Sequence, residues 1–273
     1  VRADVLLIES DERYAAQSFR YFHPTEFVIT NLYRDQLTRN GHPEWVYDAI
    51  LPALHPETEL LLNAADPLSS CFAQGHDKVK WFGLDRCPTD TEAPTGMYHD
   101  GAYCPVCHAP MEYDYVHYNH IGAFRCTKCG HRKPATDYTA TALDLERGTL
   151  TIDGSVTIQL AFRSIYNVYN ILAAYAACRE CGVASDTAAG VINNYILKNG
   201  RMQKFTLGEH RGMLLTRKHE NSIAYDTNLR YIRPPQEHST VRVIVDAVSR
   251  KYFTRETTCL RDLDFAELNT PQV

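Results

Sequence analysis

The chain has 273 residues, of which 44% are hydrophobic and 22% are charged, so extensive disorder is excluded and the length suggests two domains. With 28 basic and 33 acidic residues the formal net charge is −5, which argues against a protein that binds nucleic acid through a basic surface, and no nucleic-acid partner is expected. No apolar run approaches the roughly 18–20 residues of a membrane span, so no transmembrane segment is expected.

The first part of the chain alternates apolar runs with helical segments. Val5 to Ile8 form a short apolar run that acidic residues follow at once, which predicts a buried strand rather than a signal peptide, in a chain that begins in mid-fold. Strands are also predicted over 27–29, 60–62 and 79–83, and helices over 12–21 and 43–53. Such alternation is typical of an α/β fold with a largely parallel sheet.

The middle of the chain contains a cysteine-rich insertion. Residues 86–100 are rich in turn formers and predict a loop, and residues 101–135 follow with four cysteines interspersed with aromatic residues. Beyond the insertion the pattern predicts short strands over 139–162 and then helices over 166–181 and 185–198.

A domain boundary is expected where this pattern ends. Asn199-Gly200 is typical of the end of a helix, and after it come short β-like runs, a helix at about 222–232 and a strand over 241–245. We therefore predict a larger domain over 1–202 and a smaller one over 203–273.

The cysteines of the insertion have the spacing of a zinc ribbon. Cys104 and Cys107 form one CxxC pair, Cys126 and Cys129 form another, and 18 residues separate the two pairs. Four thiolates of this kind bind one Zn²⁺ tetrahedrally and leave no position open for water, which favours structural zinc. The alternative is a ribbon that touches nucleic acid. The other five of the nine cysteines are interpreted as ordinary thiols, and the composition indicates a cytoplasmic protein.

Polar side chains follow three of the predicted strands. Glu9 follows the first strand, Asn31 and Asp35 the second, and Asn63 and Asp66 the third. Ligands of open α/β sheets bind beyond the carboxyl ends of the strands, and oxygen ligands suit Mg²⁺ with a phosphorylated compound. The alternative is that each of these residues is a helix cap or a turn former.

Several segments together resemble the MurT family of the Mur ligase superfamily. They are IESDE (8–12), TNLYRDQLTRNG (30–41), LLNAADPL (61–68), the cysteine segment (103–134), YNVYNILAAYA (166–176) and NGRMQKF (199–205). The resemblance spans most of 1–205, and the inserted ribbon is its most specific element. It implies a Mur ligase-like central parallel-sheet domain with an inserted four-cysteine zinc ribbon, followed by a smaller α/β C-terminal domain.

The resemblance also implies an activity. The family is the synthetase subunit of lipid II isoglutaminyl synthase, which uses ATP and Mg²⁺ to activate the α-carboxyl of D-glutamate in the peptidoglycan stem peptide. Ammonia from a GatD-like glutaminase subunit then forms the amide. The implied location is the cytoplasm, at the inner face of the membrane, with lipid II as the substrate.

Roles for individual residues are implied by the same resemblance. Glu9 matches a Mg²⁺-binding glutamate, Asn31 and Asp35 match a segment near metal and substrate, and Asn63 and Asp66 match an adenine-nucleotide motif. Further matches are Asn167 and Asn170 on a helix, Arg201 as a phosphate-binding arginine, and Asp246, Asp262 and Asp264 as candidates for an aspartate lent to the glutaminase.

Three departures from the family pattern support a second hypothesis. The chain contains no Gly-Lys dipeptide and hence no P-loop, Ala65 replaces an aspartate of the nucleotide motif, and residues 217–229 lack a proline. The chain by itself is therefore expected to be inactive. The alternative function is a catalytically incompetent zinc-ribbon module, on a Mur ligase fold, that binds a partner.

Overall fold

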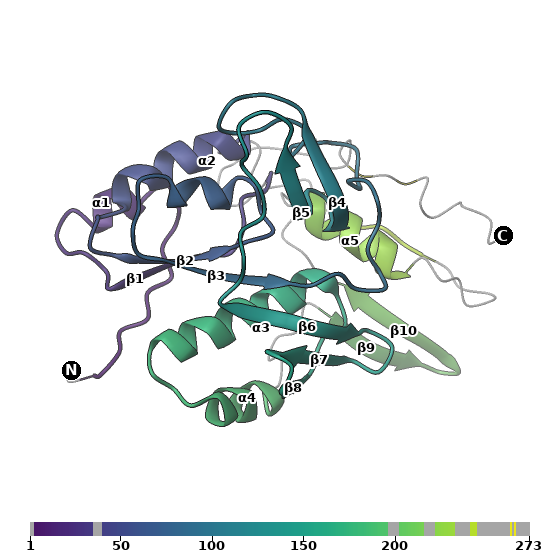
Figure 1. Cartoon of the computed structure of the whole chain (residues 1–273). Coiled ribbons are helices and arrows are strands. Elements are labelled where there is room, and N and C mark those ends of the chain that lie inside the picture. The colour runs from purple at the N-terminus through teal and green to yellow at the C-terminus, as the bar shows by residue number, and fades with distance from the viewer. Residues whose placement is uncertain are drawn as a thin grey trace. The chain divides into compact units, whose positions relative to one another are not determined.

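The computed structural model describes residues 3–34, 40–195, 202–215, 222–232 and 241–244, together with Leu263 and Phe265 (Figure 1). The chain divides into two compact units. The first comprises residues 1–32, 42–95 and 99–195, and the second comprises residues 33–41, 96–98 and 196–273. The predicted boundary at residue 202 stays a prediction. Within the described residues, no helix has the length and apolar character needed to cross a membrane.

A six-stranded sheet organises the first unit. Its strands are β1 (Glu26–Ile29), β2 (Glu59–Asn63), β3 (Val79–Leu84), β6 (Tyr138–Asp144), β7 (Thr149–Ile152) and β8 (Val156–Gln159), in the order β1-β2-β3-β6-β7-β8. The first four strands are parallel, and β7 and β8 are antiparallel additions. The prediction of an α/β fold with a mostly parallel central sheet is therefore confirmed.

Helices cover both faces of this sheet. They are α1 (Ala15–Ser18), α2 (Pro43–Ile50), α3 (Ile165–Glu180) and α4 (Ser185–Asn193), with short 3₁₀ turns η1 (Leu51–Ala53) and η2 (Ser69–Ala73). Leu60 and Leu62 pack with Val46 of α2 and Phe72 of η2, and α3 contacts β2, β3 and β6. Because both faces are covered, all three leucines of β2 are buried, which explains its continuous apolar run.

The cysteine-rich insertion is a separate antiparallel hairpin of β4 (Met111–Tyr118) and β5 (Ile121–Cys126). Gly122 lies where this hairpin approaches the main sheet, and its N–H donates to Ala65 O at 2.9 Å. A Cβ atom at Gly122 would lie 2.3 Å from Tyr115 O of the neighbouring strand β4, so the close pairing of β4 with β5 at this position requires glycine.

The described part of the second unit contains one hairpin and one helix. Strands β9 (Met202–Leu207) and β10 (His210–Leu215) are antiparallel and are joined by a turn in which Gly208 has a φ of +60°. Helix α5 (Ser222–Ile232) follows and matches the predicted helix at 222–232.

Three predicted elements differ from the structure. Residues 5–8 have no regular structure and Leu7 is 92% exposed, so the predicted buried strand is wrong. An apolar run becomes a strand only where a neighbouring strand accepts its backbone hydrogen bonds, and none of the described strands pairs with it. The strand expected from residue 241 is likewise absent over 241–244. The helix predicted over 12–21 is shorter in the structure, where only α1 (Ala15–Ser18) is helical.

Three carboxylates cluster where β1 meets β2. Glu26 is aligned with Glu59 across the parallel pair. Burial, followed by the charges of Glu180 and Glu59, raises the pKa of Glu26 to about 7. A raised folded-state pKa means that ionisation of Glu26 destabilises the fold as pH rises from 4.5, its ordinary value, to about 7, and the full penalty remains above pH 7.

Replacing Glu26 with glutamine is therefore expected to stabilise the protein at pH 8 by on the order of 1 kcal/mol, after allowance for solvent screening, and to change little at pH 4. Urea unfolding at the two pH values measures this difference. The exposed Glu146→Gln is the control and should show no pH-dependent gain. Equal effects of Glu26→Gln at both pH values would contradict the assignment.

Candidate functional site

Asn63 is the last residue of β2, at the carboxyl end of the parallel strands, and it binds the chain that follows β1. Its side-chain Nδ2 donates to Thr30 O at 2.9 Å, and its Oδ1 accepts from Ala65 N at 2.9 Å. The side chain is fully buried. Asn63 therefore closes its own turn and ties β2 to the chain after β1.

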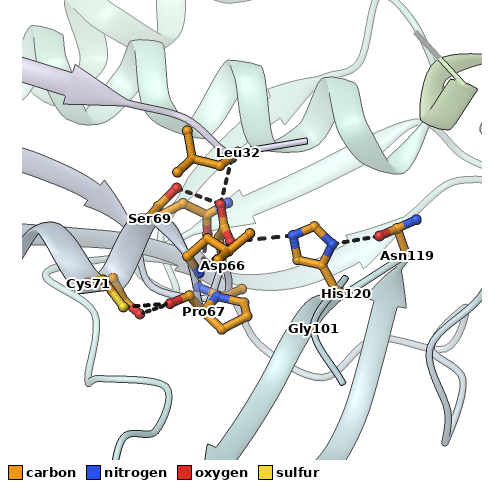
Figure 2. A network of polar contacts seen from close by, with 12 residues as sticks. Leu32, Asp66, Pro67, Ser69, Cys71, Gly101, Asn119 and His120 are labelled. Carbon is orange, nitrogen blue, oxygen red and sulfur yellow. Dashed lines mark hydrogen bonds and ion pairs between the residues drawn. The ribbon is translucent and has the colours of Figure 1, made fainter. Parts of the chain in front are cut away.

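Asp66 makes a denser set of contacts three residues later (Figure 2). Its carboxylate accepts hydrogen bonds from Leu32 N at 2.7 Å and from Leu68 N at 2.9 Å. The Ser69 hydroxyl donates to Oδ2 at 2.5 Å, and His120 Nε2 lies 3.5 Å from Oδ1. Four groups from three separate segments thus converge on one carboxylate.

These contacts keep Asp66 ionised although it is fully buried. Burial alone would raise the pKa of Asp66, but the hydrogen bond and the charge of His120 lower it, and the bonds from Ser69 and Leu32 lower it further. The net effect is a pKa below the ordinary value.

The two buried side chains hold the backbone on both sides of Asn31. Asn63 binds Thr30 O, and Asp66 binds Leu32 N, so the main chain is fixed immediately before and after Asn31. The Asn31 side chain is only half-buried. Of the three predicted residues that the structure brings together, Asn31 alone therefore offers an accessible polar side chain at this edge of the sheet, whereas Asn63 and Asp66 have none.

The zinc-ribbon hairpin braces the same segment. His120 lies at its tip, between β4 and β5, and reaches Asp66. His131 follows β5, and its Nε2 lies 3.1 Å from both Pro67 O and Ser70 Oγ. Burial lowers the pKa of His131, which favours the neutral ring. Residues on both sides of β5 therefore contact the segment that follows β2.

The four predicted zinc ligands lie together. Sγ of Cys104 is 3.5 Å from that of Cys129, Sγ of Cys107 is 3.5 Å from that of Cys126, and all four atoms lie within 4.8 Å of one another. Zn–S bonds of about 2.3 Å in a tetrahedron require sulfur atoms about 3.8 Å apart, so these residues fit a zinc ion.

The backbone around these cysteines is shaped for the same purpose. The residue after each CxxC pair has a positive φ, +58° at His108 and +79° at Gly130. Hydrogen bonds from the N–H groups of Cys129 and Lys128 lower the pKa of Cys126 to about 6, so this sulfur is a thiolate at neutral pH.

Glu9 and Asn167, two of the remaining predicted site residues that the structure describes, do not contact Asp66. Glu9 is exposed in a segment without regular structure. Asn167 lies in the first turn of α3, where its Nδ2 donates to Phe162 O at 3.1 Å. Five further residues of the prediction lie outside the described residues: Asp35, Arg201, Asp246, Asp262 and Asp264.

His120 and His131 also belong to this edge of the sheet, through their contacts with Asp66 and Pro67. No local pattern points to their roles, because the partners of His131 lie 64 and 61 residues away along the chain. Only the packing of the hairpin against the sheet brings them together.

Comparison with curated proteins shows homology over the whole chain. The chain is 28% identical over all its 273 residues to the lipid II isoglutaminyl synthase (glutamine-hydrolyzing) subunit MurT of Staphylococcus aureus strain COL. It is 31% identical over 217 residues, 76% of the chain, to the MurT subunit of Streptococcus pneumoniae strain R6. It spans 61% of the length of the first relative and 46% of the second. No family model matches the chain.

Comparison with solved structures shows a Mur ligase-like fold. A pseudomurein peptide ligase type C from Methanothermus fervidus is similar over 81% of the chain and 44% of its own, with a TM-score of 0.67 and 24% identity. MurF from Acinetobacter baumannii is similar over 81% of the chain and 40% of its own, with a TM-score of 0.53 and 12% identity. The predicted resemblance and fold class are thereby confirmed.

Proposed function

Since the chain is a homologue of MurT subunits with a Mur ligase-like fold, we propose that it acts as the synthetase subunit of a lipid II isoglutaminyl synthase. The reaction is an ATP-dependent amidation of the α-carboxyl of D-glutamate in the stem peptide of lipid II. A GatD-like glutaminase subunit supplies the ammonia, and the enzyme works at the inner face of the membrane. The whole-length similarity to MurT subunits is the observation that carries this proposal.

The edge of the sheet beyond β1 and β2 is the proposed place for the Mg²⁺ nucleotide. Ligands of open α/β sheets collect at this edge, and amide and carboxylate oxygens suit Mg²⁺. Asn31 fits this role because its backbone is held on both sides while its side chain stays accessible. When bound, Mg²⁺ offsets negative charge on the phosphates during transfer to the carboxylate.

Asn63 and Asp66 act indirectly in this proposal. Their side chains have no accessible surface, and each makes one hydrogen bond to the backbone next to Asn31. They are therefore positioning residues: they present Asn31 and do not touch the nucleotide. This assignment refines the adenine-nucleotide role that the resemblance implies for them.

Replacing Asn31 with alanine is expected to lower amidation by about 10–100-fold, because a fixed polar contact to the metal or phosphate is lost. The assay supplies lipid II, ATP, glutamine and the glutaminase subunit to the natural full-length protein, and mass spectrometry detects amidated lipid II. Asn194→Ala, at the exposed end of α4, is the matched control and should retain full activity. Undiminished turnover in Asn31→Ala would remove Asn31 from the site.

The same assay distinguishes the second hypothesis, a binding module without catalysis. A wild-type protein that binds the glutaminase but yields no amidated lipid II would favour the binding module. Amidation that depends on ATP would exclude it.

A further inference from the structure

A second cluster of metal-ligating side chains lies outside the four-thiolate site. Cys87 and Asp90 come from the turn after β3, and His117 comes from β4. His117 Nδ1 lies 2.6 Å from Asp90 Oδ1, and Cys87 Sγ lies 2.9 Å from the same oxygen and 3.9 Å from His117 Nδ1. One sulfur, one carboxylate oxygen and one imidazole nitrogen thus meet within 4.8 Å of one another.

The turn that carries two of these residues has the spacing of a zinc knuckle. Cys87-Pro88-Thr89-Asp90 matches Cys104-Pro105-Val106-Cys107, with aspartate in place of the second cysteine. Asp90 N donates to Cys87 O at 3.1 Å, and Cys87 N donates to Asp90 Oδ2 at 2.8 Å. The closed turn points Sγ and Oδ1 toward His117, as a knuckle points its two ligands toward one ion.

The imidazole of His117 is oriented as a metal ligand. Its Nε2 lies 3.3 Å from Leu84 O, within reach to donate a hydrogen bond to this carbonyl. Metal-bound histidines almost always donate the other ring N–H to a carbonyl or carboxylate, which leaves the ligating nitrogen unprotonated. Here the nitrogen left to bind a metal is Nδ1, the one that faces Cys87 and Asp90.

A buried tyrosine beside the cluster provides an independent observation. Tyr169 of α3 is 1% exposed, its ring centre lies 5.8 Å from that of His117, and its hydroxyl has no hydrogen-bond partner among the described residues. A buried hydroxyl without a partner indicates a missing ion or water.

We propose that Cys87, Asp90 and His117 bind a second divalent transition-metal ion of the zinc class. The Tyr169 hydroxyl, directly or through a water molecule, completes its four ligands. Metal binding releases two protons, that of the Cys87 thiol and the one shared by His117 Nδ1 and Asp90 Oδ1, and replaces the hydrogen bonds that now join the three side chains.

The two metal sites lie at opposite ends of one strand. Met111, at the start of β4, pairs with the zinc ligand Cys126, and His117 is six residues further on, about 20 Å along the strand. The second ion therefore joins the turn after β3 to the end of β4 remote from the four-thiolate site. In this proposal the second ion joins one end of β4 to the turn after β3, and the zinc ion at the other end of β4 holds the four cysteines together.

Metal stoichiometry tests this proposal directly. The natural protein, purified under zinc-buffered conditions, is expected to contain two zinc ions per chain by elemental mass spectrometry. Cys87→Ser and His117→Gln are each expected to contain one. Cys178→Ser, which removes a half-buried thiol of α3, is the control and should retain two. In the cobalt-substituted protein, Cys87→Ser should lose about one fifth of the thiolate-to-metal absorption, since one of five thiolates is removed.

Two results would overturn the proposal. One is a wild-type protein with a single zinc ion per chain that Cys104→Ser removes completely, which would leave the second cluster as a hydrogen-bonded network. The other is a second ion that Cys87→Ser and His117→Gln both retain. If these variants do not fold, the wild-type stoichiometry still decides.

Discussion

Replacing Asp66 with asparagine is expected to lower the free energy of unfolding by about 3 kcal/mol, because a buried charge with four partners is lost. Asparagine keeps the shape but presents an NH₂ group where Asp66 presents an oxygen. That NH₂ group then faces another donor: Leu32 N–H, the Ser69 hydroxyl or His120. Urea unfolding measures the change, and the exposed Asp77→Asn is the control, with an expected change below about 0.5 kcal/mol.

The pH dependence gives this prediction a second readout. The folded-state pKa of Asp66 lies below its ordinary value of 3.8, so its stabilisation is fully present above that value and is lost as pH falls through the folded-state pKa. Wild-type stability should therefore fall more steeply below about pH 4 than the stability of Asp66→Asn. If the free energies of unfolding of the two proteins changed with pH in the same way, protonation of Asp66 would not be coupled to unfolding.

Amidation should fall together with stability in Asp66→Asn if the positioning role is right. Asp66 holds Leu32 N, next to Asn31, so its loss frees the backbone of the residue proposed to contact the nucleotide. Assayed well below its unfolding midpoint, the folded variant should show reduced kcat. Normal kcat in the folded variant would leave Asp66 with a structural role alone.

Replacing Cys104 with serine is expected to remove the ion bound by the four cysteines and to destabilise the ribbon by several kcal/mol. Structural zinc contributes about 10–16 kcal/mol in small zinc-finger peptides, and three thiolates retain only part of this binding energy. Elemental analysis measures the metal loss, and thermal unfolding measures the loss of stability. Cys178→Ser is again the control. A variant that loses its ion with unchanged stability would contradict the structural role.

The loss should extend beyond the ribbon to the edge of the main sheet. His131 contacts Pro67 O and Ser70, and Gly122 N donates to Ala65 O, so the ribbon holds the chain that follows β2. Hydrogen exchange of residues 64–71 is therefore expected to accelerate in Cys104→Ser. Unchanged exchange there would mean that the ribbon does not brace the proposed nucleotide site.

The sequence by itself determined the features that depend on local spacing. Two CxxC pairs 18 residues apart specify four convergent thiolates, because each short turn points both of its sulfur atoms the same way. Alternating apolar runs and helical segments likewise determine an α/β sheet, since each element shows its own periodicity along the chain.

Only the tertiary structure decided which polar groups are buried and what they bind. Asn63 and Asp66 follow a strand, as active-site residues do, yet packing buries both, and Asp66 binds Leu32 N from 34 residues away. Val5 to Ile8 are as apolar as a core strand and yet are exposed, because burial requires a neighbouring strand. Long-range hydrogen bonds and burial depend on which segments meet in space, and residue spacing along the chain does not contain that information.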